Sequence, residues 1–270
     1  MNKQILYILL ALILFYGCDH VFEYHPYDLN LSAKYKHINQ KNIDRILALD
    51  QSKDTVRFIM MGDTQRWYDE TESFVKAVNK RDDVDFVIHG GDISDFGMKK
   101  EYCWVHDIMS DLKVPYVALI GNHDNLGSGR EVYEAMYGEL NFSYMFRGVK
   151  FVCLNTNALD FDYSVAVPDF QFIRKEVLDT VHENYHSTIV VMHTQPDNIV
   201  FNNNSKDLFQ FYMNSFRNLR FCLHAHEHRT MIKDIFDDGV LYYGCSSMKG
   251  RSYLLFTLTK DSYGYEEVFF

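Results

Sequence analysis

Polar residues of metal-binding types follow short apolar segments along the chain. Three of these segments close with glycine and then a polar residue, and two others close with histidines. The set is Asp63, Gln65, Asp92, Asn122, His193, His226 and His228. Because it mixes carboxylate, amide and imidazole donors, it suits Mn²⁺, Fe or Zn²⁺ better than Ca²⁺ or Mg²⁺ alone. The sequence therefore predicts a transition-metal site assembled from distant parts of the chain.

The spacing within this set favours two neighbouring ions. His226 and His228 are two residues apart, so in an extended segment they share a face and can each serve one ion. A carboxylate such as Asp92 can bridge two ions that lie about 3.5–4 Å apart. Such a pair binds phosphate oxygens and generates hydroxide at neutral pH. Hydrolysis of phosphate esters is therefore the chemistry that these residues predict.

The elements that must position these residues are short strands that alternate with helices. From about residue 55 the sequence predicts strands at 56–61, 85–89 and 116–120, separated by helices at 72–80 and 99–112. Apolar strands that alternate with helices indicate a parallel sheet covered on both faces. Ligands of such sheets bind beyond the carboxyl ends of the strands, where the polar residues lie. The glycines permit a sharp turn there and leave room for an ion or a substrate.

After about residue 141 the sequence becomes richer in strands. One helix is expected at 168–180, and a short one at 39–49 precedes the first strand. Further strands are expected at 142–147, 149–155, 188–192, 220–223, 231–236, 240–243, 253–259 and 265–269. We interpret the chain as one α/β domain in which two packed sheets are flanked by helices.

The composition limits the class of partner. A chain of 270 residues suits one large domain or two small ones and can bury a sizeable core. Its net charge of −10 argues against non-specific binding to a nucleic-acid polymer or to an anionic bilayer. The charge does not argue against a small phosphate-ester substrate, because site metals reverse the local sign of the field. We attribute the aromatic share of 16% mainly to packing.

The first residues form a targeting segment. Lys3 provides a positive start, residues 5–16 are an unbroken apolar run, and Gly17-Cys18 follows. The run fits a signal peptide and is shorter than the roughly 20 residues that a spanning helix needs. The ending Phe15-Tyr16-Gly17-Cys18 resembles a bacterial lipobox, in which the cysteine becomes the lipidated first residue. An ordinary signal peptide or an anchor helix is the alternative.

The other cysteines and histidines are expected to be structural or to have no special role. Cys103, Cys153, Cys222 and Cys245 form no C-x-x-C pair, so no zinc-thiolate site is predicted. Cys153 and Cys222 stand within apolar runs, as buried thiols do. The histidines concerned are His89, His106, His182, His186 and His224.

Taken in order, the motifs resemble the five motif blocks of calcineurin-like metallophosphoesterases. The blocks here are D-x-Q from Asp63, G-G-D ending at Asp92, G-N-H-D from Gly121, a lone His193 after a strand, and A-H-E-H from Ala225. Each block alone is weak, G-N-H-D is the most specific, and the ordered set is strong. The resemblance implies a four-layer α-β-β-α sandwich and a dinuclear centre that hydrolyses phosphate esters.

The resemblance also implies a role for each residue. It assigns the first ion to Asp63, Gln65, Asp92 and His228, and the second ion to Asp92, Asn122, His193 and His226. His123 would be the acid or the phosphate-stabilising residue, oriented by Asp124. Asn122 and His123 are also expected to contact the substrate, and so is Arg66, because it directly follows the first motif block and its guanidinium can pair with a phosphate.

Two positions depart from the family pattern. Gln65 stands where the first block usually has histidine, and Ala225 stands where the last block usually has glycine. An amide oxygen is a weaker and harder donor than imidazole, so we expect a weaker first site that favours Mn²⁺ or Fe over Zn²⁺. Ala225 costs little unless its backbone needs a positive φ. The weakened site motivates an alternative function, a non-catalytic metal-containing binding lipoprotein.

The expected organisation is a signal peptide at 1–17, a lead-in at 18–54 and a metallophosphoesterase domain at 55–270. We expect an exported lipoprotein, periplasmic or at the cell surface, that meets the membrane only through a lipid anchor on Cys18. Substrate specificity is expected in rim loops, at 124–130, 160–167 and 202–204.

Overall fold

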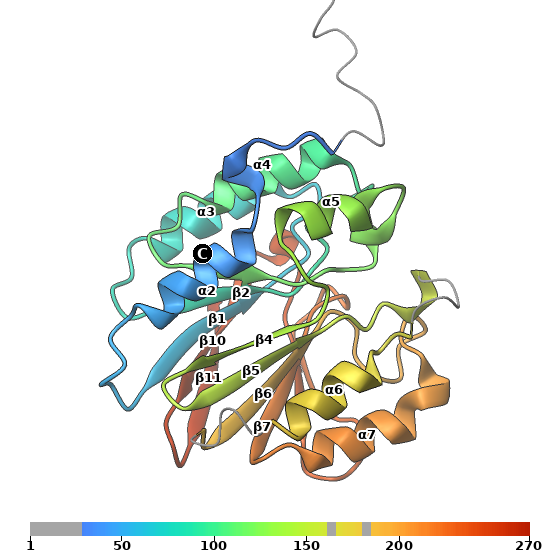
Figure 1. The fold of residues 1–270 in the computed structure, drawn as a ribbon. Coiled ribbons are helices and arrows are strands. Elements are labelled where there is room, and N and C mark those ends of the chain that lie inside the picture. The colour runs from blue at the N-terminus through green and yellow to red at the C-terminus, as the bar shows by residue number, and fades with distance from the viewer. Residues whose placement is uncertain (1–28, 161–165, 180–184) are drawn as a thin grey trace, which may run out of the picture.

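The computed structural model describes residues 29–160, 166–179 and 185–270 (Figure 1). The expected signal peptide at 1–17, Cys18 and His182 lie outside these residues, as does most of the rim loop expected at 160–167. No helix within the described ranges is long and apolar enough to cross a membrane.

A mixed sheet carries the first three motif blocks, and its strand order is β11-β10-β1-β2-β3. The strands β1 (Val56–Met61), β2 (Phe86–His89) and β3 (Tyr116–Ala118) run parallel. The strand β10 (Ser252–Leu258) pairs antiparallel with both β1 and β11 (Tyr263–Phe269). Because β1, β2 and β3 share one direction, the residues that follow them lie along one edge of the sheet.

A second mixed sheet carries the two histidine blocks, and its strand order is β4-β5-β6-β7-β9-β8. The inner strands β5 (Val149–Leu154), β6 (Ser187–Met192), β7 (Leu219–His224) and β9 (Leu241–Gly244) run parallel. The edge strands β4 (Phe142–Phe146) and β8 (Met231–Asp234) are antiparallel to their neighbours. The two strands expected on either side of Gly148 therefore form a hairpin, as the sequence pattern indicates.

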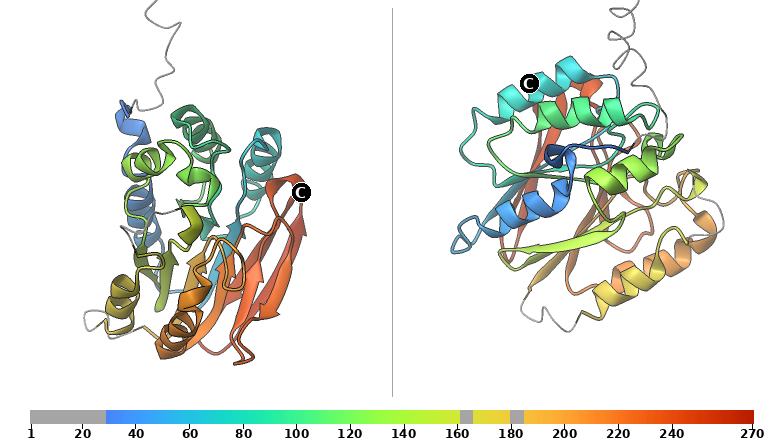
Figure 2. Two further views of the ribbon diagram at one scale, coloured as in Figure 1. Left: turned by 90° about the vertical axis from the view of Figure 1, so that its right-hand side faces the viewer. Right: turned by 45° about the horizontal axis from the view of Figure 1, so that its top comes forward.

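Helices cover the outer face of each sheet, so the molecule has four layers (Figures 1 and 2). The first sheet is covered by α3 (Tyr68–Val78), α4 (Lys99–Met109) and α5 (Gly129–Met136). The second is covered by α6 (Phe170–Val177) and α7 (Lys206–Ser215). Short 3₁₀ turns are η1 (Ala33–Tyr35), η2 (His123–Asn125), η3 (Ala158–Asp160), η4 (Asn203–Ser205) and η5 (Met248–Gly250). The expected α/β sandwich of two mixed sheets flanked by helices is confirmed.

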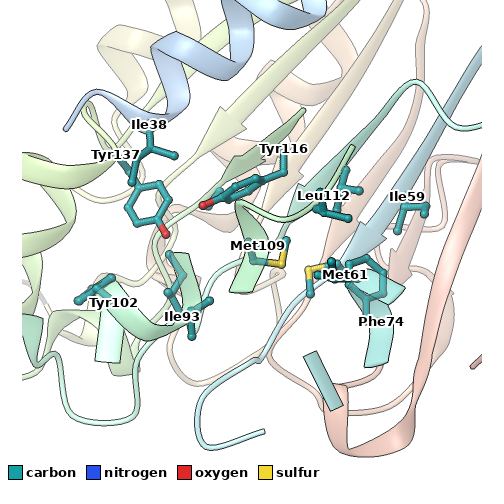
Figure 3. Close-up of a cluster of buried hydrophobic side chains, with 14 of the residues drawn as sticks. Ile38, Ile59, Met61, Phe74, Ile93, Tyr102, Met109, Leu112, Tyr116 and Tyr137 are labelled. Atoms are coloured by element: carbon teal, nitrogen blue, oxygen red, sulfur yellow. The ribbon is translucent and has the colours of Figure 1, made fainter. Parts of the chain in front are cut away.

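Three apolar clusters hold these layers together. One lies between the first sheet and its helices, where Ile59 and Met61 of β1 come together with Phe74 and Met109 (Figure 3). A second fills the space between the sheets, and a third lies between the second sheet and α6 and α7. The middle cluster is rich in aromatic rings, such as the stacked pair Phe58 and Phe256, and each fully buried phenylalanine contributes about 1.5–3 kcal/mol. Packing thus accounts for much of the aromatic composition.

The helix α2 (Ile38–Leu47) covers β3, the edge strand of the first sheet. The side chain of Asn39 donates to the carbonyl of Ala118 and accepts from its N–H, both at 2.9 Å. The carbonyl oxygen of the Asn42 side chain accepts from the N–H of Tyr116 at 3.3 Å. These amides satisfy the free edge that β3 would otherwise expose. The expected lead-in therefore contains a helix that packs on the sandwich.

The described cysteines are unpaired thiols. Cys153, Cys222 and Cys245 are buried, and Cys103 is partly exposed. Burial raises the pKa of the Cys153 and Cys222 thiols, so both stay protonated at neutral pH. The expectation that Cys153 and Cys222 are core residues is confirmed.

Candidate metal centre

Side chains that follow β1, β2, β3, β6 and β7 meet at one rim of the two sheets. Donor atoms of Asp92, His193 and His226 lie within 4.8 Å of one another, and so do donor atoms of Asp63, Asp92 and His228. Asp92 belongs to both groups. The structure thus brings these residues together as two adjacent clusters that share one carboxylate, the arrangement that a bridged pair of ions requires.

The two amide side chains of the predicted set complete the clusters. Oδ1 of Asn122 lies 3.1 Å from Nε2 of His193 and 2.9 Å from Nδ1 of His226. Nε2 of Gln65 donates a hydrogen bond to Oδ2 of Asp92 at 3.0 Å. We name Asp92, Asn122, His193 and His226 the inner cluster, and Asp63, Gln65 and His228, with the shared Asp92, the outer cluster.

Two oxygens of the outer cluster are buried and poorly satisfied. Oε1 of Gln65 has no hydrogen-bond partner. Oδ1 of Asp63 has Nε2 of the half-exposed His228 ring at 3.2 Å. A buried polar atom that lacks a partner costs about 1–3 kcal/mol. A cation between these oxygens would supply the missing partner, so the residues present fit a metal ion.

The backbone is turned to the left-handed region at four residues of the two clusters. The φ angles are 54° at Asp63, 56° at Asp92, 69° at His226 and 53° at His228. For residues other than glycine this region is uncommon, and an imposed conformation of this kind costs roughly 1–3 kcal/mol. Each turn therefore loses some stability while it directs a donor group towards the shared centre.

Ala225, by contrast, does not have a positive φ, so replacement of the usual glycine causes no backbone strain there. Its methyl group occupies space that two glycines leave free. A Cβ atom on Gly62 would lie 3.0 Å from the Ala225 Cβ, and one on Gly90 would lie 2.9 Å from it. Gly62 and Gly90 therefore leave room for the Ala225 methyl group, whereas the sequence pattern predicts that the glycines at these turns leave room for an ion or a substrate.

Burial and mutual attraction set the charges of the inner cluster. Burial disfavours the charged forms of both His193 and Asp92, yet their 3.3 Å ion pair outweighs it. The pKa of His193 is raised to about 9, and the pKa of Asp92 is held below its ordinary value. Burial lowers the pKa of His226 to about 4, so this ring is neutral. The cluster thus holds one proton where a cation would bind.

In the outer cluster the carboxylate and the imidazole shift in the same direction. Burial raises the pKa of Asp63. The interaction with the Asp63 carboxylate raises the pKa of His228, against the effect of its own partial burial. A cation would compensate the buried carboxylate more fully than this half-exposed imidazole does.

His123 stands beside the inner cluster, and Asp95 fixes its orientation. Its backbone N–H donates to Oδ1 of Asp92 at 3.0 Å. Its ring atom Nδ1 donates to the backbone carbonyl of Asp95 at 3.0 Å and lies 3.5 Å from the Asp95 carboxylate. This contact leaves Nε2 available to a substrate. The Asp95 carboxylate also forms an ion pair with Arg66, so one residue holds both the imidazole and the guanidinium.

The expectation that Asp124 orients His123 is wrong. Asp124 is fully buried, and its carboxylate accepts hydrogen bonds from backbone N–H groups of the neighbouring loops. The donors are Ile93 at 3.1 Å, Ser94 at 2.8 Å and Gly121 at 2.9 Å. Burial raises the pKa of Asp124 to about 6. Its lone pairs are committed to joining the loops after β2 and β3, so it supports the site and does not act within it.

Sequence reasoning missed Asp95 and the residues that follow β5. Asp95 lies three residues after Asp92, and a G-G-D-x-x-D pattern was the only available signal. After β5, the side chain of Asn157 donates to the carbonyl of Ile120 at 3.0 Å, and the Thr156 hydroxyl donates to the carbonyl of Thr194 at 2.7 Å. These bonds connect the strand ends that carry the inner cluster.

The neighbouring histidines have structural contacts, as expected. Nδ1 of His89 accepts from the N–H of Gly91 at 3.2 Å, and Nε2 lies 2.9 Å from the Thr64 hydroxyl. His89 thus connects the two turns that carry Asp63 and Asp92. His224 is buried, and its Nδ1 donates to the carbonyl of Ala225 at 2.9 Å.

Two further residues have structural contacts. His106 lies in α4, as expected, and is buried with its Nδ1 2.7 Å from the Tyr116 hydroxyl. In the loop expected at 202–204, the Asn203 side chain is used within the loop, accepting from the N–H of Asp197 and donating to the carbonyl of Asn198.

Comparison with protein families gives one clear result. The sequence profile described as "Calcineurin-like phosphoesterase" matches residues 56–230, which is more than half of the chain. A search of the curated proteins gives no match.

Several solved structures share the fold at low sequence identity. A dimetal phosphatase from Danio rerio is 12% identical, with 78% of this chain and 95% of that chain covered and a TM-score of 0.63. A purple acid phosphatase from yellow lupin seeds is 12% identical, covers 80% of this chain and has a TM-score of 0.62, but only 52% of its own length is spanned. GAP50 of Plasmodium is 12% identical, with 80% and 85% covered and a TM-score of 0.59. These likenesses concern the fold.

Proposed function

Because this chain belongs to the calcineurin-like phosphoesterase family, we propose that it hydrolyses phosphate esters with two divalent ions held by the inner and outer clusters. The observation that carries the proposal is the sharing of Asp92 by the two clusters. The outer cluster supports it as well, because Oε1 of Gln65 is buried without a hydrogen-bond partner and the buried Asp63 carboxylate is paired only with a half-exposed imidazole.

The donor set supports Mn²⁺ or Fe in preference to Zn²⁺. Asp63, Gln65 and His228 would hold one ion, Asn122, His193 and His226 the other, and Asp92 both. When bound, two ions of this kind polarise the phosphoryl oxygens and lower the pKa of a water molecule that they hold, which supplies hydroxide at neutral pH. In the outer cluster Gln65 replaces an imidazole with a harder oxygen donor, which favours Mn²⁺ or Fe.

The chain's own residues would bind the substrate and move one proton. The guanidinium of Arg66 would pair with a phosphoryl oxygen, and Asn122 would help to position the same group. Nε2 of His123 would give its proton to the departing alkoxide, while Asp95 holds the ring through Nδ1.

A second proposal concerns location: we propose export and a lipid anchor on Cys18, which the N-terminal sequence pattern supports.

The test measures hydrolysis of chromogenic phosphomonoester and phosphodiester substrates by the protein without its expected signal peptide. Its metals are first removed with a chelator, and Mn²⁺, Fe²⁺, Zn²⁺ or Mg²⁺ is then added. We expect turnover to return with Mn²⁺ or Fe²⁺. In His123→Ala it should fall by about 10²–10⁴-fold, the usual contribution of general acid–base catalysis, while both ions stay bound. A folded protein that binds two ions and hydrolyses neither ester would overturn the proposal.

A non-catalytic metal-containing binding lipoprotein is the alternative. The half-exposed His228 and the weak donor Gln65 favour it, because they would leave the outer ion loosely held. A protein with this fold, GAP50, is described as the anchor in the inner membrane complex of Plasmodium. Metal content separates the two functions: two ions with turnover support the enzyme, and one tightly held ion without turnover supports the binding protein.

A further inference from the structure

Four large apolar side chains are exposed on loops that surround the two clusters. Each loop follows a strand that leads to the site: β2, β3, β5 or β6. The exposed fractions are 60% for Phe96, 41% for Leu126, 66% for Leu159 and 81% for Ile199. We name these four residues the apolar rim. Ile199 is the most exposed of the large hydrophobic side chains in the described chain.

The loops of the apolar rim pack against one another in pairs. A Cβ atom on Gly97 would lie 2.0 Å from the carbonyl oxygen of Leu126, so the Phe96 and Leu126 loops are in close contact. The N–H of Leu159 donates to the carbonyl of Val200 at 3.1 Å, which joins the Leu159 and Ile199 loops. The four loops that carry the apolar rim therefore meet in two pairs.

Three members of the apolar rim are chain neighbours of groups at the site. Phe96 directly follows Asp95, whose carbonyl accepts from His123, and Leu126 follows η2, which begins with His123. Asp160, next to Leu159, interacts electrostatically with Asp92, His193 and His123. On the other side, Arg66 pairs with Asp95, so a cation and the apolar surface flank the same imidazole.

We propose that the substrate is the phosphate ester of an apolar, long-chain alcohol, whose hydrocarbon chain lies on the apolar rim. This inference rests on the proposed function. The P–O bond to the alcohol breaks, water supplies the hydroxyl that stays on phosphorus, and His123 protonates the leaving oxygen. The leaving group then lies on the His123 side of the site, and the loops that follow the strands around this site carry Phe96, Leu126, Leu159 and Ile199.

The test is a homologous series of substrates: butyl, hexyl and octyl phosphate esters of whichever class the protein hydrolyses, each below its micelle concentration. The phosphate-containing product that each ester releases is measured with Mn²⁺ present. A fully buried methylene gives up to about a fourfold gain, so we expect kcat/KM to rise from butyl to octyl by roughly tenfold or more. An equal rate along the series, with turnover present, would overturn the substrate class and leave the phosphoesterase intact.

Variants locate the contact. In Leu159→Ser/Ile199→Ser the octyl-to-butyl ratio should fall at least fivefold, roughly the effect of re-exposing one or two methylenes. The matched control is Leu208→Ser/Phe211→Ser, which changes two exposed apolar side chains on α7 and should leave the ratio unchanged. A ratio that survives in the rim variant would overturn the inference. Absence of turnover with every ester and both ions bound would overturn the proposed function and this inference with it.

Discussion

The inner and outer clusters share Asp92 but differ in how the protein satisfies them. In the inner cluster His193 is fully buried, its Nδ1 donates to the carbonyl of Gly90 at 2.8 Å, and Asn122 contacts both imidazoles. In the outer cluster the side chain of His228 is 49% exposed. The outer cluster also contains Oε1 of Gln65, which is buried without a hydrogen-bond partner.

This difference indicates how each cluster meets a metal ion. The inner donors are already held in place by mutual hydrogen bonds, so an ion that binds there loses little free energy to reorganisation. The outer donors have fewer such contacts: Oε1 of Gln65 is buried without a hydrogen-bond partner, and the side chain of His228 is half exposed. We therefore expect the inner ion to bind more tightly than the outer ion.

The largest effect is expected from the residue that the clusters share. Asp92→Asn should release both ions and lower kcat/KM by roughly a thousandfold or more, because the metal pair contributes several kcal/mol to the transition state. Metal content by mass spectrometry and steady-state rates would measure it. A variant that keeps two ions and full rate would contradict both the bridging role and the division into clusters.

Next in size is the residue that holds His123. Asp95→Ala keeps the backbone carbonyl that accepts from Nδ1 of His123 but removes the carboxylate that lies 3.5 Å from that atom, so kcat should fall by about tenfold while both ions remain bound. The loss should be larger for substrates with poorly acidic leaving groups, because these depend most on the proton from His123. Equal losses for all leaving groups would show that Asp95 acts through general folding instead.

The control for that prediction is Asp124→Asn. It replaces one carboxylate oxygen with an NH₂ donor, so either the N–H of Ser94 or the N–H groups of Ile93 and Gly121 lose their acceptor, and we expect lower thermal stability rather than a leaving-group effect. If Asp124→Asn reproduced the leaving-group dependence, the assignment of Asp95 as the positioning residue would fail.

A smaller effect separates the clusters directly. Gln65→His should raise the affinity of the outer site for Zn²⁺ by about tenfold, because imidazole is the softer donor, and should leave the inner site unchanged. Its counterpart His228→Ala should release one ion and keep the other. Calorimetric titration of Zn²⁺ into protein whose metals have been removed with a chelator would show both results. A loss of both ions in His228→Ala would show that the clusters are not independent.

The metal donors could be predicted from sequence because each stands at the end of a strand. Apolar runs such as 56–61 identify the strands, and parallel strands bring their ends to one edge whatever their distance along the chain. The orienting residue could not be predicted in the same way. Asp124 is the chain neighbour of His123, but the turn directs its side chain to the loop after β2, while Asp95 reaches His123 from that same loop.

Two helices also escaped prediction, for a local reason. In α5 the buried apolar side chains are Val132, Tyr133 and Met136, one short stretch that begins at a glycine. In α7 only Phe209 and Met213 are buried, and an asparagine-rich loop precedes them. Patterns of one or two turns do not outweigh turn-forming residues, and tertiary packing decides whether such segments become helical.

The last prediction uses the proton that the inner cluster holds in place of a cation. The pKa of His193 is raised to about 9, above its ordinary value of 6.5, so the proton stabilises the metal-free fold fully below about pH 6.5 and is lost as pH rises through 9. A bound ion replaces that proton, and its apparent affinity rises as the competing proton leaves. The gap in Tm between Mn²⁺-loaded and chelated protein should therefore widen from pH 6 to pH 9. Thermal unfolding across that range measures it, and a gap that is constant or narrows would show that His193 carries no proton in the metal-free protein.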